Sequence, residues 1–99
     1  MKHFLLFYRY HSDYLTKREA FRVEHLKLAR AASAEGNLLL GGALVDPVDT
    51  GVLLFSAQTA DVVHRFALAD PYVINGLVES WQVREWHTVA GQNAAFPMD

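Results

Sequence analysis

The sequence predicts an α+β fold in which the elements follow the order strand, helix, strand, strand, helix, strand. Three observations predict it: an aromatic first segment without glycine or proline, two segments of helical periodicity that each end at a helix-stop signal, and an alternating segment near the end. With 99 residues, of which 52% are hydrophobic, the chain is the size of one small domain with a packed core. We therefore expect a single domain over residues 1–99.

The first strand and the first helix follow from local composition. Lys2–Tyr10 is rich in aromatic residues, and apolar residues occupy both of its alternating sets, which is typical of a strand that is covered on both faces. Thr16, with Glu19 three residues later, fits a capping box that opens a helix. We expect that helix to end near Glu35, before a left-handed stop at Gly36.

The middle of the chain predicts a hairpin and a second helix. Leu38–Gly42 and Gly51–Ser56 are short apolar segments that flank a turn-rich loop, so they form the two strands. Thr59 is placed to cap a helix over Ala60–Ala69, where apolar residues recur at helical spacing.

The last third of the chain contains a turn, a strand and a tail. Asp70-Pro71 ends or bends the second helix, and Gly76 closes a short turn. Leu77–His87 alternates apolar and polar residues and is the final strand, which leaves Thr88–Asp99 as a tail of small residues. This element order is the ferredoxin-like βαββαβ arrangement, with one antiparallel sheet and two helices on one face.

Charge and composition exclude several classes of function. A net charge of -2 gives no basic excess for binding a phosphate backbone, so nucleic acid is not an expected partner. The absence of cysteine excludes disulfides, thiolate nucleophiles and cysteine-ligated metals. The apolar segment Phe4–Tyr8 is too short for a membrane span or a signal-peptide core, and we expect a cytoplasmic protein that does not bind membranes.

The first strand also predicts self-association. Two helices can cover only one face of the sheet, whereas Lys2–Tyr10 is apolar on both faces. Large exposed apolar patches are rare on monomers, and most oligomers are two-fold symmetric. We therefore expect a homodimer in which two sheets meet face to face.

A polar row runs along one side of the first predicted helix. Arg18, Arg22, His25, Ala29 and Ser33 follow spacings of four, three, four and four, so they lie on one side, and His25 falls within the apolar arc. A structural explanation gives the arginines apolar stems with solvated heads and makes His25 a core histidine bonded to a carbonyl. A functional explanation aims His25 into a cavity beside cationic groups.

Asp70 is the best candidate for a carboxylate partner of His25. Such a carboxylate would fix the imidazole tautomer and leave the other ring nitrogen free to move a proton. Pro71 stiffens the segment and Tyr72 offers a hydroxyl group nearby. The alternative is that Asp70 forms an Asx turn that caps the short helical turn before Gly76.

These residues resemble the YCII family of YciI-like proteins. The resemblance rests on His25-Leu26 in an arginine-bearing helix, on Glu35–Leu39 with the glycines that follow, and on Asp70–Val73 with Gly76-Leu77. It implies a ferredoxin-like fold that dimerises into an α+β barrel, and an active-site pair formed by His25 and Asp70. Among family members with an assigned activity, it points to a dehydrochlorinase that acts on a chlorinated hydroxyhydroquinone.

Three functions remain open from the sequence. The first is a cofactor-independent lyase or isomerase in which His25 moves a proton, Asp70 orients it, and Arg18, Arg22, Ser33 and Tyr72 bind a small anionic or phenolic substrate. The second is a dimeric small-molecule-binding or accessory protein without a reaction.

The third function is metal binding. Its ligands would come from His11, His64, His87 or the pair Asp46 and Asp49. No His-x-x-x-His or comparable spacing supports it, and we expect neither a metal nor a cofactor.

Overall fold

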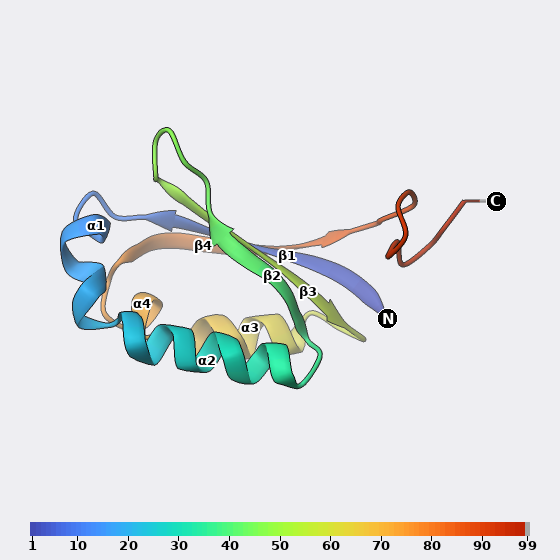
Figure 1. The fold of residues 1–99 in the computed structure, drawn as a ribbon, viewed down its shortest axis with the longest axis horizontal. Coiled ribbons are helices and arrows are strands. Elements are labelled where there is room, and N and C mark those ends of the chain that lie inside the picture. Colours follow the sequence, from blue (N-terminus) through green and yellow to red (C-terminus); the bar gives the residue numbers. More distant parts are fainter. Residues whose placement is uncertain (99) are drawn as a thin grey trace.

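The structure is a four-stranded sheet with a layer of helices on one face (Figure 1). It is a computed structural model, and it describes residues 1–98. In chain order the elements are β1 (Lys2–Tyr10), α1 (Tyr14–Lys17), the 3₁₀ helix η1 (Arg18–Ala20), α2 (Arg22–Ala34), β2 (Leu38–Ala43), β3 (Thr50–Ala57), α3 (Asp61–Ala69), α4 (Pro71–Ile74) and β4 (Val78–Trp86).

The strand order confirms the predicted fold class. The strands lie in the order β2-β3-β1-β4, and β1 pairs antiparallel with both β3 and β4. The β2–β3 hairpin is antiparallel as well. This is the ferredoxin-like arrangement, and it places the first strand in the centre of the sheet.

The two faces of the sheet differ in what covers them. Toward the helices, β1 buries Phe4, Leu6 and Tyr8, which pack with the buried side chains of β3, α3 and the start of β4. The outward residues Leu5 and Phe7 are only half-buried. The prediction that both helices cover one face, while the other face stays apolar, is therefore confirmed for this chain.

The predicted capping box at Thr16 and Glu19 is wrong. Thr16 lies inside α1, and its hydroxyl donates to the carbonyl of Asp13 at 2.8 Å. Phe21 adopts φ -121° and ψ 0°, outside the helical range, and separates η1 from α2. Helix α2 begins without a side-chain cap. One predicted helix is thus three helical segments, because the backbone changes from α to 3₁₀ geometry at Arg18 and the non-helical Phe21 then interrupts it.

The other boundaries lie within a residue or two of the predictions. Thr59 is not the N-cap of α3, which is Ala60, but its hydroxyl accepts from the N–H of Asp61, the first residue of that helix, at 3.3 Å. Gly36 and Gly76 both have positive φ, which suits their predicted positions at helix ends. The C-terminal segment folds back on itself.

Thr88 anchors that tail. Its hydroxyl bonds Nδ1 of His3 at 2.7 Å and accepts from the N–H of Ala95 at 2.8 Å. Phe96 stacks on His87, with the ring centroids 4.3 Å apart. Asp99, the last residue of the predicted tail, lies outside the described residues.

Candidate functional site

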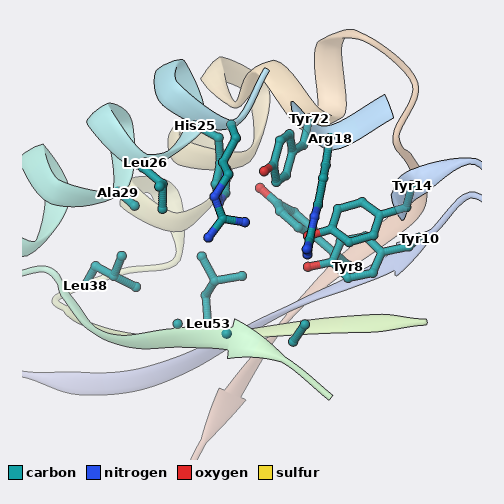
Figure 2. A pocket seen from close by; sticks show the side chains of 14 residues that line it. Tyr8, Tyr10, Tyr14, Arg18, His25, Leu26, Ala29, Leu38, Leu53 and Tyr72 are labelled. Carbon is teal, nitrogen blue, oxygen red and sulfur yellow. The ribbon is translucent and has the colours of Figure 1, made fainter. Parts of the chain in front are cut away.

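A cavity of about 350 Å³ lies between α2 and the helix-facing side of the sheet (Figure 2). Aromatic and cationic side chains gather at one end, and small and aliphatic residues form the other end. The lining residues are Tyr8, Tyr10, Tyr14, Arg18, Arg22, His25, Leu26, Ala29, Leu38, Gly41, Gly42, Ala43, Leu53 and Tyr72.

His25 and Asp70 meet beside this cavity. Nδ1 of His25 lies 2.9 Å from Oδ1 and 3.0 Å from Oδ2 of the Asp70 carboxylate. The Asp70 side chain is fully buried, whereas the His25 side chain keeps 16% of its surface exposed. The structure therefore brings together two residues that lie 45 positions apart in the chain.

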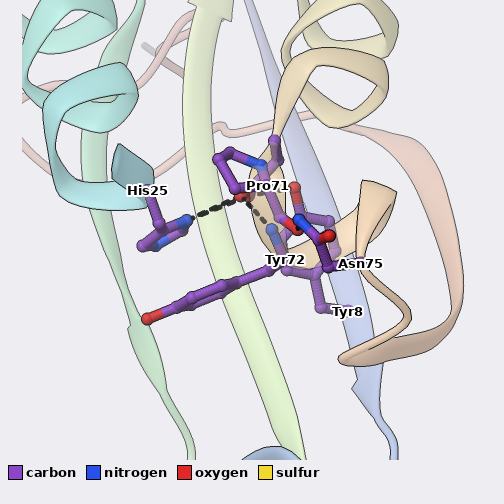
Figure 3. A network of polar contacts seen from close by, with 6 residues as sticks. Tyr8, His25, Pro71, Tyr72 and Asn75 are labelled. Atoms are coloured by element: carbon purple, nitrogen blue, oxygen red, sulfur yellow. Dashed lines mark hydrogen bonds and ion pairs between the residues drawn. The ribbon is translucent and has the colours of Figure 1, made fainter. Parts of the chain in front are cut away.

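The Asp70 carboxylate accepts two further hydrogen bonds. The hydroxyl of Tyr8 donates to Oδ2 at 2.7 Å, and the backbone N–H of Tyr72 donates to Oδ1 at 3.0 Å. Figure 3 shows this network around the start of α4. Asp70 is thus both the N-cap of α4 and the partner of His25, so the two interpretations left open by the sequence hold together.

These bonds determine which nitrogen of His25 is available. An ionised carboxylate only accepts hydrogen bonds, so the proton shared with Asp70 belongs to Nδ1 of His25. A neutral imidazole then has its free lone pair on Nε2. Because His25 lines the cavity, Nε2 is the atom that a bound molecule would meet.

Tyr72 fixes the plane of the imidazole. The two rings stack with centroids 3.9 Å apart and an interplanar angle of 9°. Burial and the neighbouring Tyr14 raise the pKa of Tyr72 to about 12, although Arg22 and Arg18 act in the opposite direction. The phenol of Tyr72 is therefore a proton donor at neutral pH.

Two arginines supply positive charge at the aromatic end. Arg18 comes from η1 and Arg22 is the first residue of α2, and both line the cavity. Arg18 makes only a long contact of 3.9 Å with Glu19 and lies 5.8 Å from the ring centre of Tyr14. Among residues 1–98, no carboxylate lies within ion-pair distance of Arg22, so its charge is open to a ligand.

Ser33 does not join the cavity. It is exposed near the far end of α2 and is not among the lining residues. Arg22, His25 and Ala29 bring one end of α2 over the cavity, and the helix continues beyond it. The helical spacing put Ser33 in line with Arg22 and His25, but it could not show where the cavity ends.

Sequence reasoning missed the tyrosines of the first strand and the first turn. All four tyrosines of the chain line this cavity. Tyr10 and Tyr14 stack with centroids 3.7 Å apart, which makes a flat wall. Tyr8 shares one face of the strand with Phe4 and Leu6, and this spacing of two would have placed its hydroxyl on the helix-facing side, beside the predicted site.

The remaining histidines and the hairpin carboxylates do not form a metal centre in the described part of the chain. Within residues 1–98, no group of three His, Cys, Asp or Glu side chains has a geometry that could hold a metal ion. Over the same residues, no helix has the length and the apolar character that crossing a bilayer requires.

Comparison with known families places the chain in a family. The family model described as the YCII-related domain matches residues 1–87. The chain belongs to the YCII-related domain family. The match includes the two partners His25 and Asp70 and every element of the sheet, and only the C-terminal tail falls outside it.

Solved structures share the fold of this YCII-related domain. The 5-chloro-2-hydroxyhydroquinone dehydrochlorinase of Burkholderia phenoliruptrix, in complex with 2,5-dihydroxybenzoquinone, superposes with a TM-score of 0.73 at 22% identity over 87% of this chain and 94% of that one. A protein of Agrobacterium tumefaciens gives 0.60 at 15% identity over 99% and 100%. A NIPSNAP domain protein of Burkholderia xenovorans gives 0.56 at 16% identity over 100% of both chains. No functionally curated protein matches the sequence.

Proposed function

We propose that this YCII-related protein is an enzyme that moves a proton on a small anionic or phenolic compound, in a reaction of the lyase or isomerase type. The observation that carries the proposal is the contact of His25 with the buried carboxylate of Asp70 at the wall of a cavity. A histidine oriented in this way is suited to general acid–base catalysis. The shared fold with a dehydrochlorinase is consistent with such chemistry, although fold alone does not assign it.

In this proposal each residue has a distinct task. Nε2 of His25 takes a proton from the substrate, and the negative charge of Asp70 stabilises the imidazolium that results. Arg18, Arg22 and the hydroxyl of Tyr72 stabilise the negative charge that develops on a substrate oxygen. The site needs no metal or organic cofactor for these steps.

The experiment compares the wild-type protein with His25→Ala and His64→Ala. His64 lies on α3 and is exposed, so it is a matched control for the loss of an imidazole. The proteins are incubated with 5-chloro-2-hydroxyhydroquinone and with a panel of small phenols and lactones, and products and released chloride are measured by mass spectrometry and ion analysis. We expect turnover in the wild type and in His64→Ala, and none in a folded His25→Ala.

Two results would contradict the proposal. A folded His25→Ala protein with undiminished turnover would remove His25 from catalysis. Binding of these compounds without any product in the wild type would favour the alternative function, a small-molecule-binding or accessory protein.

We also propose that the protein is a homodimer that buries the outer face of the sheet. Leu5, Phe7, Val52 and Leu54 form a half-buried apolar surface there, and Leu40 at the edge is 71% exposed. Phe7→Glu should give a monomer in sedimentation velocity, whereas Val23→Glu on the exposed side of α2 should leave the dimer intact. A wild-type monomer at micromolar concentration would contradict the dimer.

A further inference from the structure

The carboxylate of Asp70 is shared by three donors in a balanced way. Oδ1 accepts from the backbone of Tyr72, and Oδ2 accepts from the hydroxyl of Tyr8. Nδ1 of His25 lies almost equidistant from the two oxygens, at 2.9 and 3.0 Å. Each oxygen therefore accepts from one donor of its own, and Nδ1 of His25 forms a bifurcated contact with both oxygens.

The position of Tyr8 on the central strand of the sheet restricts its side chain. It lies on β1 between Gly51 of β3 and Trp81 of β4, and it is 1% exposed. Burial and the neighbouring Asp70 carboxylate raise the pKa of Tyr8 far above that of a free phenol. Its hydroxyl therefore remains a proton donor, and its ring has no room to turn away.

We propose that Tyr8 is a positioning residue for the His25–Asp70 pair: its hydroxyl occupies Oδ2 and so keeps the imidazole shared between both carboxylate oxygens. This role rests on the proposed function only for its consequence in catalysis, because the geometry itself is independent of any reaction. Without the hydroxyl, Oδ2 becomes the better acceptor, and His25 forms one shorter bond to it. Tyr8 thereby sets both the strength of the His25–Asp70 bond and the direction of Nε2.

The backbone donor cannot replace Tyr8 in this role. The N–H of Tyr72 is fixed by the turn that begins α4, and it reaches only Oδ1. Tyr10 and Tyr14 line the same cavity, but neither forms a hydrogen bond to Asp70 among the described residues. The structure therefore offers a matched comparison between hydroxyl groups that share one environment.

The test measures the hydrogen bond directly by nuclear magnetic resonance. In protein labelled with ¹⁵N-histidine, the downfield proton resonance of His25 Nδ1–H is assigned by its loss in His25→Gln. Tyr8→Phe removes one oxygen and keeps the ring, so the bond to Asp70 should strengthen and the resonance should move further downfield. Tyr14→Phe removes a hydroxyl that does not reach Asp70, and the resonance should stay in place.

A second measurement covers the case in which Tyr8→Phe does not fold. Protein that carries 3-fluorotyrosine at position 8 alone has a stronger phenol donor there and an unchanged Tyr72 against the imidazole, and the same resonance should then move upfield. An unmoved resonance in folded Tyr8→Phe, or a shift in the opposite direction in either sample, overturns the proposal.

The resonance separates this proposal from the proposed function, because it requires no substrate. If the wild-type protein shows turnover, Tyr8→Phe should lower kcat and leave KM unchanged, since Tyr8 acts through Asp70. A Tyr8→Phe protein whose KM rises while kcat is unchanged would assign Tyr8 to substrate binding and would overturn the positioning role.

Discussion

The hydroxyl of Tyr10 occupies the space that a Cβ atom on residue 51 would need. An added Cβ at Gly51 would meet that hydroxyl and would lie 2.9 Å from Cζ of the same ring. The φ angle of Gly51 is not in the left-handed region, so the requirement is one of space and not of backbone conformation. Gly51 thus allows the ring of Tyr10 to lie over β3 and to form the wall of the cavity with Tyr14.

Gly51→Ala should therefore destabilise the protein and displace Tyr10. Overpacking of this kind costs about 1–3 kcal/mol, which urea unfolding would measure. Gly42→Ala is the matched control, because Gly42 lines the same cavity and its added Cβ would meet nothing within 4 Å. Equal stabilities of the two variants would contradict the close approach of Tyr10 to Gly51.

Asp70→Ala should destabilise the protein more than His25→Ala does. Removal of Asp70 leaves the buried hydroxyl of Tyr8 and the N–H of Tyr72 without their acceptor, and it removes the N-cap of α4. We expect a loss of about 3 kcal/mol for Asp70→Ala and about 1 kcal/mol for His25→Ala, whose removal leaves Asp70 with two donors. Thermal and urea unfolding of the two variants check the order, and a reversed order would contradict the network.

Arg22→Gln should weaken the binding of small anions. Arg22 lines the cavity without a carboxylate partner in residues 1–98, so its charge is available to a ligand. Loss of a charge-assisted hydrogen bond weakens binding by about tenfold or more. Calorimetry with 4-nitrophenolate measures it, and Ser33→Ala should bind like the wild type because Ser33 is exposed outside the cavity. Similar losses in both variants would place the ligand elsewhere.

The protein should lose stability at alkaline pH as its buried tyrosines ionise. The pKa of Tyr72 is raised from 10.0 to about 12, and burial also raises those of Tyr8 and Tyr10. A raised pKa stabilises the folded state fully below pH 10, and this contribution falls between pH 10 and about 12, where only the unfolded chain ionises. Unfolding free energies should decline over this range, with phenolate absorbance that appears together with unfolding. Phenolate absorbance in a fully folded protein near pH 10 from more than one tyrosine would contradict this.

Much of the fold was determined by local sequence patterns. The aromatic segment Lys2–Tyr10 forms the predicted strand with the predicted bounds, and the glycines at 36 and 76 lie at helix ends. These features depend on backbone preferences and on the alternation of apolar residues, which act over a few positions. The predicted capping box did not form, because the Thr16 hydroxyl donates to the backbone carbonyl of Asp13 in the preceding turn.

The amino-acid sequence by itself determined the element order, the apolar outer strand face and the side of the helix on which His25 lies. Only the tertiary structure decided that the carboxylate that caps α4 also binds His25. It also decided that the hydroxyl of Tyr8 donates a hydrogen bond to that carboxylate and that Ser33 lies beyond the cavity. The physical reason is that these contacts join residues far apart in the chain, so the antiparallel register of β1 and the position of α2 over the sheet place them, whereas no local pattern does.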